Sequence, residues 1–424
     1  MSDVAQTLLS VDGAQTRVSV PLRTRPFAAS TYPSPREREL LLDAYDSGEW
    51  SGFRAGIGER DARELCTLPS SVVRELPPHE SRFLGGRYVR MLEALFAART
   101  GCTYAIACNS ATSGLAMAAG AIGLQPGDEV LVPCMSFHAT ATAMLAFGGV
   151  PVFVEVDPET LCLDVADAEA KLTPRTRAIV AVHLGGIPAA MTSIVALARR
   201  AGLAVIEDCA QAPGARVGGR EVGSLGDAGV FSLVETKSIT CGEGGVVVTN
   251  DPRVAMKCRL IRNHGEGAAE EHWSDDELTN VVGMNYRLTE LQAAVAVGQF
   301  EQLDARNRVR NANARQLIAG LRGFHRLVPQ RCDDGCDPAY FVLKLRDRDD
   351  RDQLVRALAA EGIPMVPGYR RLLHQHPLFV RRSRDACPRS VAINDELLWF
   401  SHLHPPNTAD DMDDVLRAFA KVLS

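Results

Sequence analysis

Hydrophobic residues between about residues 90 and 250 fall into short runs rich in valine and isoleucine, and amphipathic helical patterns separate these runs. Such alternation is typical of a parallel sheet covered by helices. We therefore predict an α/β fold. The predicted strands are Tyr104–Ala107, Glu129–Val132, Pro151–Glu155, Ala178–Val182, Ala204–Glu207, Val230–Ser232 and Val246–Thr249, and the clearest helices between them are Thr112–Ile122 and Ala189–Ala201.

The later part of the chain has a different pattern. Apolar residues at helical spacing run from Leu288 to Asp304 and continue into a charged helical stretch, 305–321, which is typical of a connector between domains. A strand at 340–345 and helices at 350–361 and 409–423 follow. Because 424 residues exceed one ordinary domain, we predict a tail at 1–25, a large domain at 26–300 and a smaller α+β domain at 301–424.

Charge argues against several classes of partner. The chain has 46 basic and 52 acidic residues and a net charge of -6, without the basic stripe that nucleic acid requires. It lacks an apolar stretch of about 18 residues, and its N-terminus has no signal-peptide pattern. We expect a cytoplasmic protein that binds neither nucleic acid nor membrane.

The eleven cysteines include no Cys-x-x-Cys pair. Cys332 and Cys336 are the one close pair, and no second pair completes a zinc site beside them. The cysteines are therefore expected to be reduced, mostly buried residues, and no metal is predicted.

Asp208 ends one of the predicted strands, where open α/β sheets bind their ligands. Alternation along the strand sends Glu207 and Asp208 to opposite faces. A carboxylate beside a pyridine nitrogen keeps that nitrogen protonated, since opposite charges about 4 Å apart gain about 4 kcal/mol at an effective dielectric near 20. By itself, Asp208 is equally compatible with a capping role at a strand end.

Lys237 favours a cofactor contact over a capping role for Asp208. An isolated lysine usually lies on the surface, but the neighbours of Lys237 are Phe231, Ile239 and the turn Gly242-Glu-Gly-Gly245, which favour a cleft. An amine there can condense with an aldehyde and then move a proton. Together with Asp208, Lys237 predicts a site for pyridoxal 5'-phosphate (PLP), and Ser232 offers a hydroxyl for the cofactor phosphate.

A second phosphate element is the segment 108–114, which follows a predicted strand and begins a helix. Backbone N–H groups at a helix N-terminus, with the hydroxyls of Ser110 and Thr112, can bind an anion. Ordinary N-capping explains the same residues. Phe137 follows another strand end and is suited either to stacking on the pyridine ring or to core packing.

These residues belong to a wider pattern that includes 182–188, 206–212, 223–227, 242–245, Gly283 with Asn285 and Arg287, and 374–377. The pattern resembles PLP-dependent aminotransferases of fold type I that act on keto sugars and aminocyclitols, the DegT and StrS type. The resemblance runs from about Pro26 to the C-terminus. It implies a mostly parallel seven-stranded sheet with flanking helices.

The resemblance also implies roles for individual residues. Lys237 would bind PLP covalently, Asp208 would contact the pyridine nitrogen, Gln211 the 3-hydroxyl, and Phe137 the ring face. The phosphate would be held by Ser110, Ala111, Thr112 and Ser232, and by Asn285 from the neighbouring subunit of a homodimer with shared sites. His374 and His183 are the candidates for substrate contact.

The reaction implied by the resemblance moves an amino group from glutamine or glutamate to a keto sugar or ketocyclitol. The segment 236–245 and Cys387-Pro look more like the scyllo-inosose branch than the nucleotide-sugar branch. Alternatives are an aminotransferase for nucleotide-linked keto sugars, a PLP lyase or dehydratase that forms an aromatic amine, and a non-catalytic regulator. The segment 50–85 is longer than the family pattern and falls where substrate loops usually lie.

Overall fold

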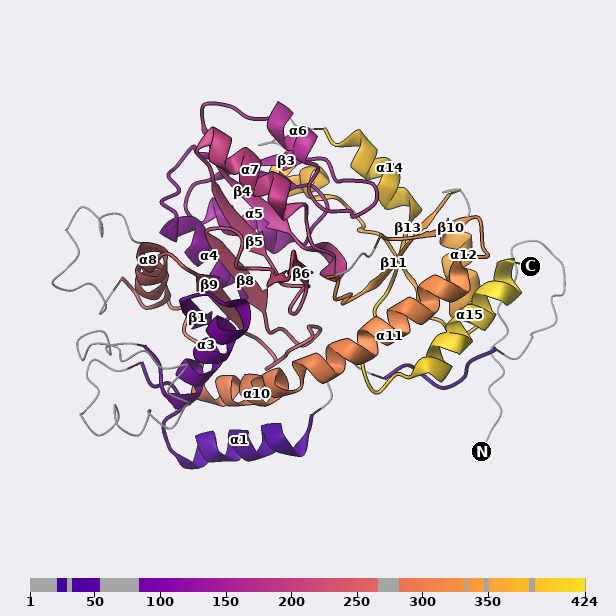
Figure 1. Cartoon of the computed structure of the whole chain (residues 1–424), viewed down its shortest axis with the longest axis horizontal. Helices are drawn as coiled ribbons and strands as arrows, with labels where there is room; N and C mark the ends of the chain where they lie inside the picture. The colour runs from indigo at the N-terminus through magenta and orange to yellow at the C-terminus, as the bar shows by residue number, and fades with distance from the viewer. Residues whose placement is uncertain are drawn as a thin grey trace.

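The computed structural model describes residues 21–28, 33–53, 84–265, 282–331, 335–346, 351–380 and 386–423. A seven-stranded sheet in the order β1-β9-β8-β5-β4-β2-β3 forms the centre of the larger domain (Figure 1). Neighbouring strands are parallel except at β9, which is antiparallel to β1 and β8. The strands are β1 Tyr104–Cys108, β2 Glu129–Pro133, β3 Val150–Val154, β4 Thr176–Val182, β5 Ala204–Asp208, β8 Ala228–Ser232 and β9 Gly245–Thr249. The prediction of a mostly parallel seven-stranded α/β fold is confirmed.

Helices cover both faces of this sheet, which explains why its strands are almost continuously apolar. Val246 and Val248 face one core, whereas Val247 between them faces the other. One face is covered by α4 Ala111–Ala121, α5 His138–Leu145, α6 Val165–Ala170, α7 Met191–Ala201 and α8 Pro252–Arg262, and the other by α3 Arg87–Thr100 and α10 Glu290–Glu301. The short strands β6 Arg216–Val217 and β7 Arg220–Glu221 form a separate hairpin.

The predicted connector is two helices, α10 and α11 Leu303–Leu321, and α11 runs from the large domain to the small one (Figure 1). Helix α1 Pro35–Asp46 packs against α10. The small domain contains an antiparallel sheet in the order β10-β11-β13-β12. Its elements are β10 Leu327–Pro329, β11 Phe341–Leu345, β12 Val366–Pro367, β13 Leu397–Phe400, α12 Arg351–Ala360 and α15 Ala409–Leu423.

The N-terminal boundary differs from the prediction. Residues 1–20 lie outside the described residues, but residues 21–25, which we assigned to a tail, pack on the small domain. Arg23 forms ion pairs with Asp411 at 2.8 Å and Asp414 at 2.7 Å, and its backbone N–H donates to the carbonyl of Glu361 at 3.1 Å. Buried, paired charges of this kind fix the segment in place, so residues 21–25 are not a tail.

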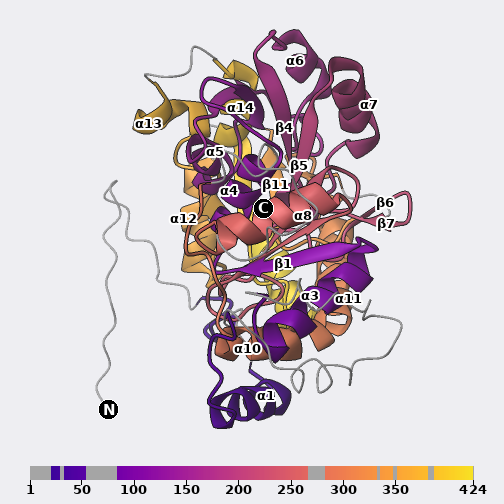
Figure 2. The same ribbon diagram turned by 90° about the vertical axis from the view of Figure 1, so that its left-hand side faces the viewer.

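Part of the C-terminal segment returns to the large domain. The 3₁₀ turn η5 Leu373–Gln375 and the helices α13 Pro377–Val380 and α14 Pro388–Glu396 lie near α5, at the β3 edge of the large sheet (Figure 2). The backbone N–H of Leu373 donates to the carbonyl of Cys134 at 2.8 Å, and Ser390 Oγ accepts from the N–H of Val156 at 2.9 Å. Residues far apart in the chain therefore meet beside β2 and β3.

Within the described part of the chain, none of the helices is long and apolar enough to span a lipid bilayer.

Candidate active site

The carboxyl ends of several strands come together along one edge of the large sheet. Asp208, the last residue of β5, pairs in register with Val182 at the end of β4 and with Val230 in β8. Ser232, the last residue of β8, pairs with Gly245 at the start of β9. Gly245 in turn pairs with the last residue of β1. The site residues predicted after β1, β5 and β8 therefore belong to one region.

Asp208 is a buried carboxylate with a fixed orientation. Its side chain accepts hydrogen bonds from Thr140 Oγ1 at 2.8 Å and from the backbone N–H of Ala210 at 3.2 Å, and the residue is 5% exposed. Burial raises the pKa of Asp208, and the hydrogen bonds and the positive charge of Lys237 offset this only in part. The ionised form of such a carboxylate is stabilised most strongly by a cationic group placed next to it.

Glu207 points to the opposite side, as the strand alternation predicts. Its carboxylate accepts the N–H groups of Gly223, Leu225 and Gly226 at 2.7–2.8 Å and contacts Nε2 of His183 at 3.1 Å. Burial opposes ionisation of Glu207, but these hydrogen bonds outweigh burial and lower its pKa. Glu207 thus fixes the loop before β8.

His183 is engaged by the protein on both ring nitrogens. Its Nδ1 accepts the N–H of Ala189 at 3.0 Å, so Nε2 carries the proton that is donated to Glu207. The residue is fully buried. The structure therefore does not bring His183 to a position from which it contacts a substrate, and the expectation from the resemblance is corrected to a supporting role beneath Glu207.

Lys237 lies in the turn between β8 and β9 and is half-buried. The turn is closed by its backbone N–H, which donates to the carbonyl of Val234 at 2.9 Å, and by the N–H of Glu235, which donates to Gly242 at 3.0 Å. Its Nζ lies 5.9 Å from the ring centroid of Tyr340, and its charge acts on Asp208. The lysine is therefore held at the same edge as Asp208 rather than extended into solvent.

The predicted phosphate turn begins α4. Ser110 is the N-cap, and its Oγ accepts the N–H of Ser113 at 3.0 Å, so ordinary capping is present. Ala111 is half-buried and Thr112 is exposed, which leaves the first helical turn accessible. A Cβ on Gly245 would lie 2.6 Å from the carbonyl carbon of Ser110 and 2.7 Å from the nitrogen of Ala111. Glycine at 245 is what allows β9 to pass directly behind this turn.

Phe137 and Gln211 flank the region. Phe137 is 62% exposed at the N-cap of α5, so it is not a core residue in this chain. Gln211 Oε1 accepts the N–H of Gly185 at 2.7 Å, which orients its amide. Ser232 is buried, and its Oγ accepts the N–H of Val234 at 3.4 Å.

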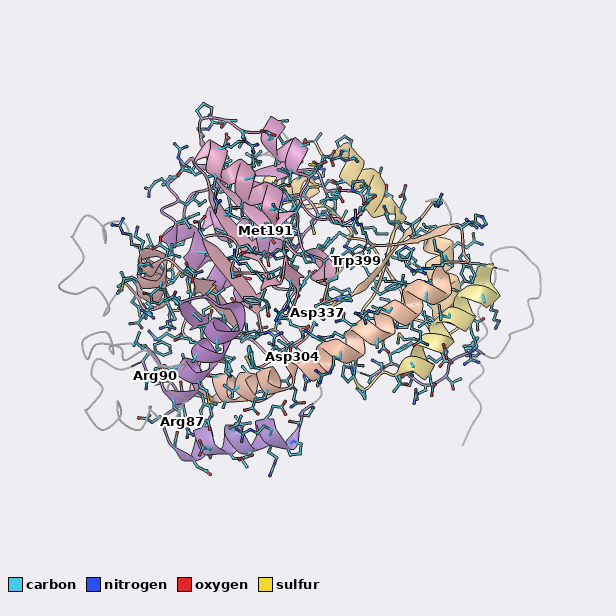
Figure 3. All side chains as sticks on the ribbon, viewed as in Figure 1. Arg87, Arg90, Met191, Asp304, Asp337 and Trp399 are labelled. Carbon is cyan, nitrogen blue, oxygen red and sulfur yellow. The ribbon has the colours of Figure 1, made fainter. Side chains whose placement is uncertain are left out.

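Three aromatic residues that the sequence did not single out reach this region from the small domain. The rings of Tyr340 and Tyr369 pack edge-on against Trp399, with centroids 6.1 and 5.6 Å away. Gln211 and Asp208 both act on the pKa of Tyr369, which burial raises. Figure 3 shows Trp399 and Asp337 between the large sheet and the small domain. The sequence did not reveal these three aromatic residues because the loop before β11, the segment after β12 and β13 itself carry no motif.

The remaining predicted residues lie at the margins. Asn285 is exposed, and Asn109 Nδ2 donates to its carbonyl at 3.4 Å, immediately before the phosphate turn. His374 is half-buried in η5. Cys336 is half-buried, whereas Cys332 and residues 54–83 of the long predicted segment lie outside the described residues.

The model of the DegT/DnrJ/EryC1/StrS aminotransferase family matches residues 71–420. The chain belongs to this family. The L-glutamine:scyllo-inosose aminotransferase of Streptomyces griseus is 35% identical over 422 residues, which cover 92% of this chain and 93% of that protein. The UDP-N-acetyl-3-dehydro-alpha-D-glucosamine 3-aminotransferase of Acidithiobacillus ferrooxidans is 39% identical over 322 residues, 75% of this chain and 84% of that protein.

A solved structure gives the same architecture. The crystal structure of 3-amino-5-hydroxybenzoic acid synthase matches with a TM-score of 0.80 and 26% identity, covering 96% of this chain and 99% of that one. The chain is a fold type I aminotransferase that uses PLP. The residues fit the cofactor: a buried carboxylate suits a pyridinium nitrogen, a half-buried lysine stands at the same edge, and Gly245 leaves room for a turn that binds phosphate.

Proposed function

We propose that this aminotransferase carries the amino group of glutamine or glutamate to the keto carbon of a cyclitol of the scyllo-inosose type. The observation that carries the reaction is the placement of Lys237 and the buried Asp208 at one edge of the sheet. The proposed cyclitol acceptor is supported by the share of this chain that aligns with each relative. The scyllo-inosose aminotransferase aligns over 92% of this chain, whereas the nucleotide-sugar enzyme aligns over 75%.

The proposed roles follow from the chemistry of each side chain. PLP supplies an electron sink that stabilises negative charge on the carbon losing a proton. Asp208 keeps the ring nitrogen protonated, and Thr140 holds the carboxylate in place. Lys237 would hold the cofactor and, as an amine, could accept and return the proton of the substrate carbon. Phe137 would lie against one face of the ring, and Gln211 would hold the 3-hydroxyl.

The phosphate would be bound by the first turn of α4 and the hydroxyls around it. Backbone N–H groups at a helix N-terminus carry a partial positive charge. Ser110, Ala111 and Thr112 supply this turn, and Ser232 lies opposite across Gly245. Ser110 Oγ accepts the N–H of Ser113 and lies 3.0 Å from Ser113 Oγ, which itself donates to Asn109. The Ser110 hydroxyl hydrogen would therefore turn from Ser113 Oγ to the phosphate when PLP binds.

A homodimer completes the proposed site. Asn285 is exposed next to the phosphate turn, and Phe137 is exposed at the cofactor position. Both features suit a site that a second copy of the chain covers, with Asn285 reaching the phosphate bound by the neighbouring subunit. Sedimentation of the PLP-loaded protein should give a dimer, and Asn285→Ala should weaken PLP binding without changing the sedimentation.

The acceptor can be identified with the pyridoxamine phosphate form of the purified protein. It is mixed with a panel of ketocyclitols and nucleotide-linked keto sugars, and recovery of the aldehyde absorbance is followed. We expect recovery with scyllo-inosose or a deoxy relative, and we expect glutamine or glutamate alone to regenerate the amine form. Recovery with nucleotide-linked sugars but not with cyclitols would contradict the proposed acceptor.

One alternative has a specific observation behind it. One of the matching solved structures is a synthase whose named product, 3-amino-5-hydroxybenzoic acid, is an aromatic amine. A PLP lyase or dehydratase that forms such a product needs no amino donor, whereas an aminotransferase does. Product analysis with the donor omitted separates the two, and we expect no product.

A further inference from the structure

Three potential metal ligands meet beside the cofactor region although they are far apart in the chain. Cys134 directly follows β2, His374 lies in η5, and Cys387 is the N-cap of α14. The two sulfur atoms and one ring nitrogen of His374 all lie within 4.8 Å of one another. No local spacing in the sequence signals this cluster, which forms only because η5 and α14 fold back onto the edge of the large sheet.

The two cysteines are held by the backbone around them. Cys134 donates its N–H to Val154 at 2.9 Å and accepts the N–H of Leu373 at 2.8 Å, so β3 and η5 both fix it. The thiol of Cys387 lies 3.7 Å from the carbonyl oxygen of Phe153. Both cysteines are buried and neither forms a disulfide. A pre-positioned pair of thiols reduces the ordering that a bound ion would require.

His374 provides an unsatisfied polar atom. Its Nδ1 is closed off from solvent and has no hydrogen-bond partner among the described residues, which is uncommon for a buried polar atom. The residue as a whole is half-buried. A bound cation is one partner that would satisfy this nitrogen.

The chemistry of the cluster suits a cation. Cysteine ligates metals as the thiolate, so a thiol releases its proton when the ion binds, and the Cys134 and Cys387 sulfur atoms lie within 4.8 Å of each other and of a ring nitrogen of His374. The second cluster of this kind, His183 with Glu207 and Cys209, differs because hydrogen bonds already occupy both nitrogens of His183 and both oxygens of Glu207.

We propose that Cys134, His374 and Cys387 form a binding site for a thiophilic divalent cation such as Zn²⁺. Two thiolates and one imidazole are a ligand set that zinc prefers, with bonds of about 2.3 Å to sulfur and about 2.0–2.1 Å to nitrogen. Ligand atoms in such a tetrahedron lie about 3.5–3.8 Å apart, so separations of up to 4.8 Å need a contraction of about 1.3 Å at most. The fourth position is left for water or a small ligand.

The bound ion would join the C-terminal segment to the large domain next to the cofactor. Cys134 lies three residues before Phe137, in the same connection between β2 and α5. Zn²⁺ would therefore fix η5 and the N-terminus of α14 against that connection. This consequence does not depend on which keto substrate the enzyme uses.

The proposal is tested with the PLP-loaded protein, which is freed of metals by chelation and kept reduced. This protein is titrated with Co²⁺, a spectroscopic probe for Zn²⁺ sites. We expect one Co²⁺ per chain with the charge-transfer absorption of thiolate ligands, and competition by Zn²⁺ with a rise in Tm. Cys134→Ala and Cys387→Ala should lose the absorption band, with affinity at least about 100-fold weaker. Cys162→Ala is the matched control, since Cys162 is a fully buried free cysteine outside the cluster.

Two further measurements test the site even if an alanine variant misfolds. His374→Asn changes a half-buried residue and should also weaken Co²⁺ binding, whereas His376→Asn should not. Absence of thiolate absorption in the wild-type protein would overturn the proposal, as would an unchanged band in Cys134→Ala. Formation of a Cys134–Cys387 disulfide under mild oxidation, without Co²⁺ binding to the reduced protein, would assign the pair to redox chemistry instead.

Discussion

Thr140 donates a hydrogen bond of 2.8 Å to Oδ2 of Asp208, and the hydroxyl of Ser136 continues this chain 2.7 Å from Thr140. All three residues are buried, Thr140 completely. The chain connects α5, which begins next to Phe137, to the end of β5, which carries the carboxylate. One helix therefore helps to position both the carboxylate and the aromatic ring assigned to the cofactor.

Thr140→Val should weaken PLP binding. The substitution keeps the shape of the side chain but removes a hydrogen bond to a charged group, which is worth about 1.5–3 kcal/mol. We expect PLP affinity to fall about 10- to 100-fold, measured by absorbance titration of the apoprotein. Thr142→Val is the control, because Thr142 lies on the same helix and donates to the carbonyl of His138 instead. Equal losses of PLP affinity in the two variants would mean that the Thr140 hydroxyl makes no specific contribution to cofactor binding.

Gly245→Ala should disturb the phosphate turn from behind. The added Cβ would lie 2.6–2.7 Å from backbone atoms of Ser110 and Ala111, which cannot move aside as a flexible side chain can. We expect weaker binding of PLP, and of inorganic phosphate to the apoprotein. Gly323→Ala should leave both affinities unchanged, because a Cβ on Gly323 meets no atom within 4 Å. Unchanged phosphate affinity in Gly245→Ala would mean that the cofactor phosphate does not bind at the first turn of α4.

The sequence predicted the large sheet almost residue by residue because its strands are buried on both faces and therefore continuously apolar. It also placed Asp208, Ser232 and Lys237 at one edge, since the carboxyl ends of parallel strands share an edge. It could not find Thr140, whose role depends on how α5 packs on β5. Nor could it find Tyr340, Tyr369 and Trp399, which depend on the docking of the small domain.

His183 shows the opposite kind of error. A histidine directly after a strand end is a reasonable candidate for ligand contact, but the hydrogen bonds of its two nitrogens depend on the three-dimensional positions of Ala189 and Glu207. Residues 21–25 are similar, because a short polar segment near a terminus has no pattern that reveals its ion pairs with α15. Both corrections concern contacts between distant parts of the chain.

His404 should make the small domain sensitive to acid. Burial lowers its pKa from the ordinary 6.5 to about 4. Because the folded pKa is the lower one, the unfolded chain takes up a proton first, and stability is lost as the pH falls from about 6.5 toward about 4. Between about pH 7.5 and about pH 5 this group should remove about 2 kcal/mol from the free energy of unfolding.

The contribution of His404 can be isolated with His404→Asn. An asparagine amide can replace the Nδ1 hydrogen bond to the carbonyl of Pro405, which is 2.9 Å long. Urea unfolding at the two pH values should show a smaller loss of stability in this variant than in the wild-type protein. His325→Asn, at an exposed position, should behave like the wild type. An identical pH dependence in His404→Asn would contradict the assignment.

The attachment of the cofactor to Lys237 can be measured directly. The PLP-loaded protein is reduced with borohydride, digested, and analysed by mass spectrometry for the lysine that carries the pyridoxyl phosphate group. We predict the modification on Lys237 alone, its absence in Lys237→Ala, and loss of repeated amino transfer in that variant. Modification of a different lysine, or sustained turnover by Lys237→Ala, would contradict the assignment of Lys237 as the residue that binds PLP.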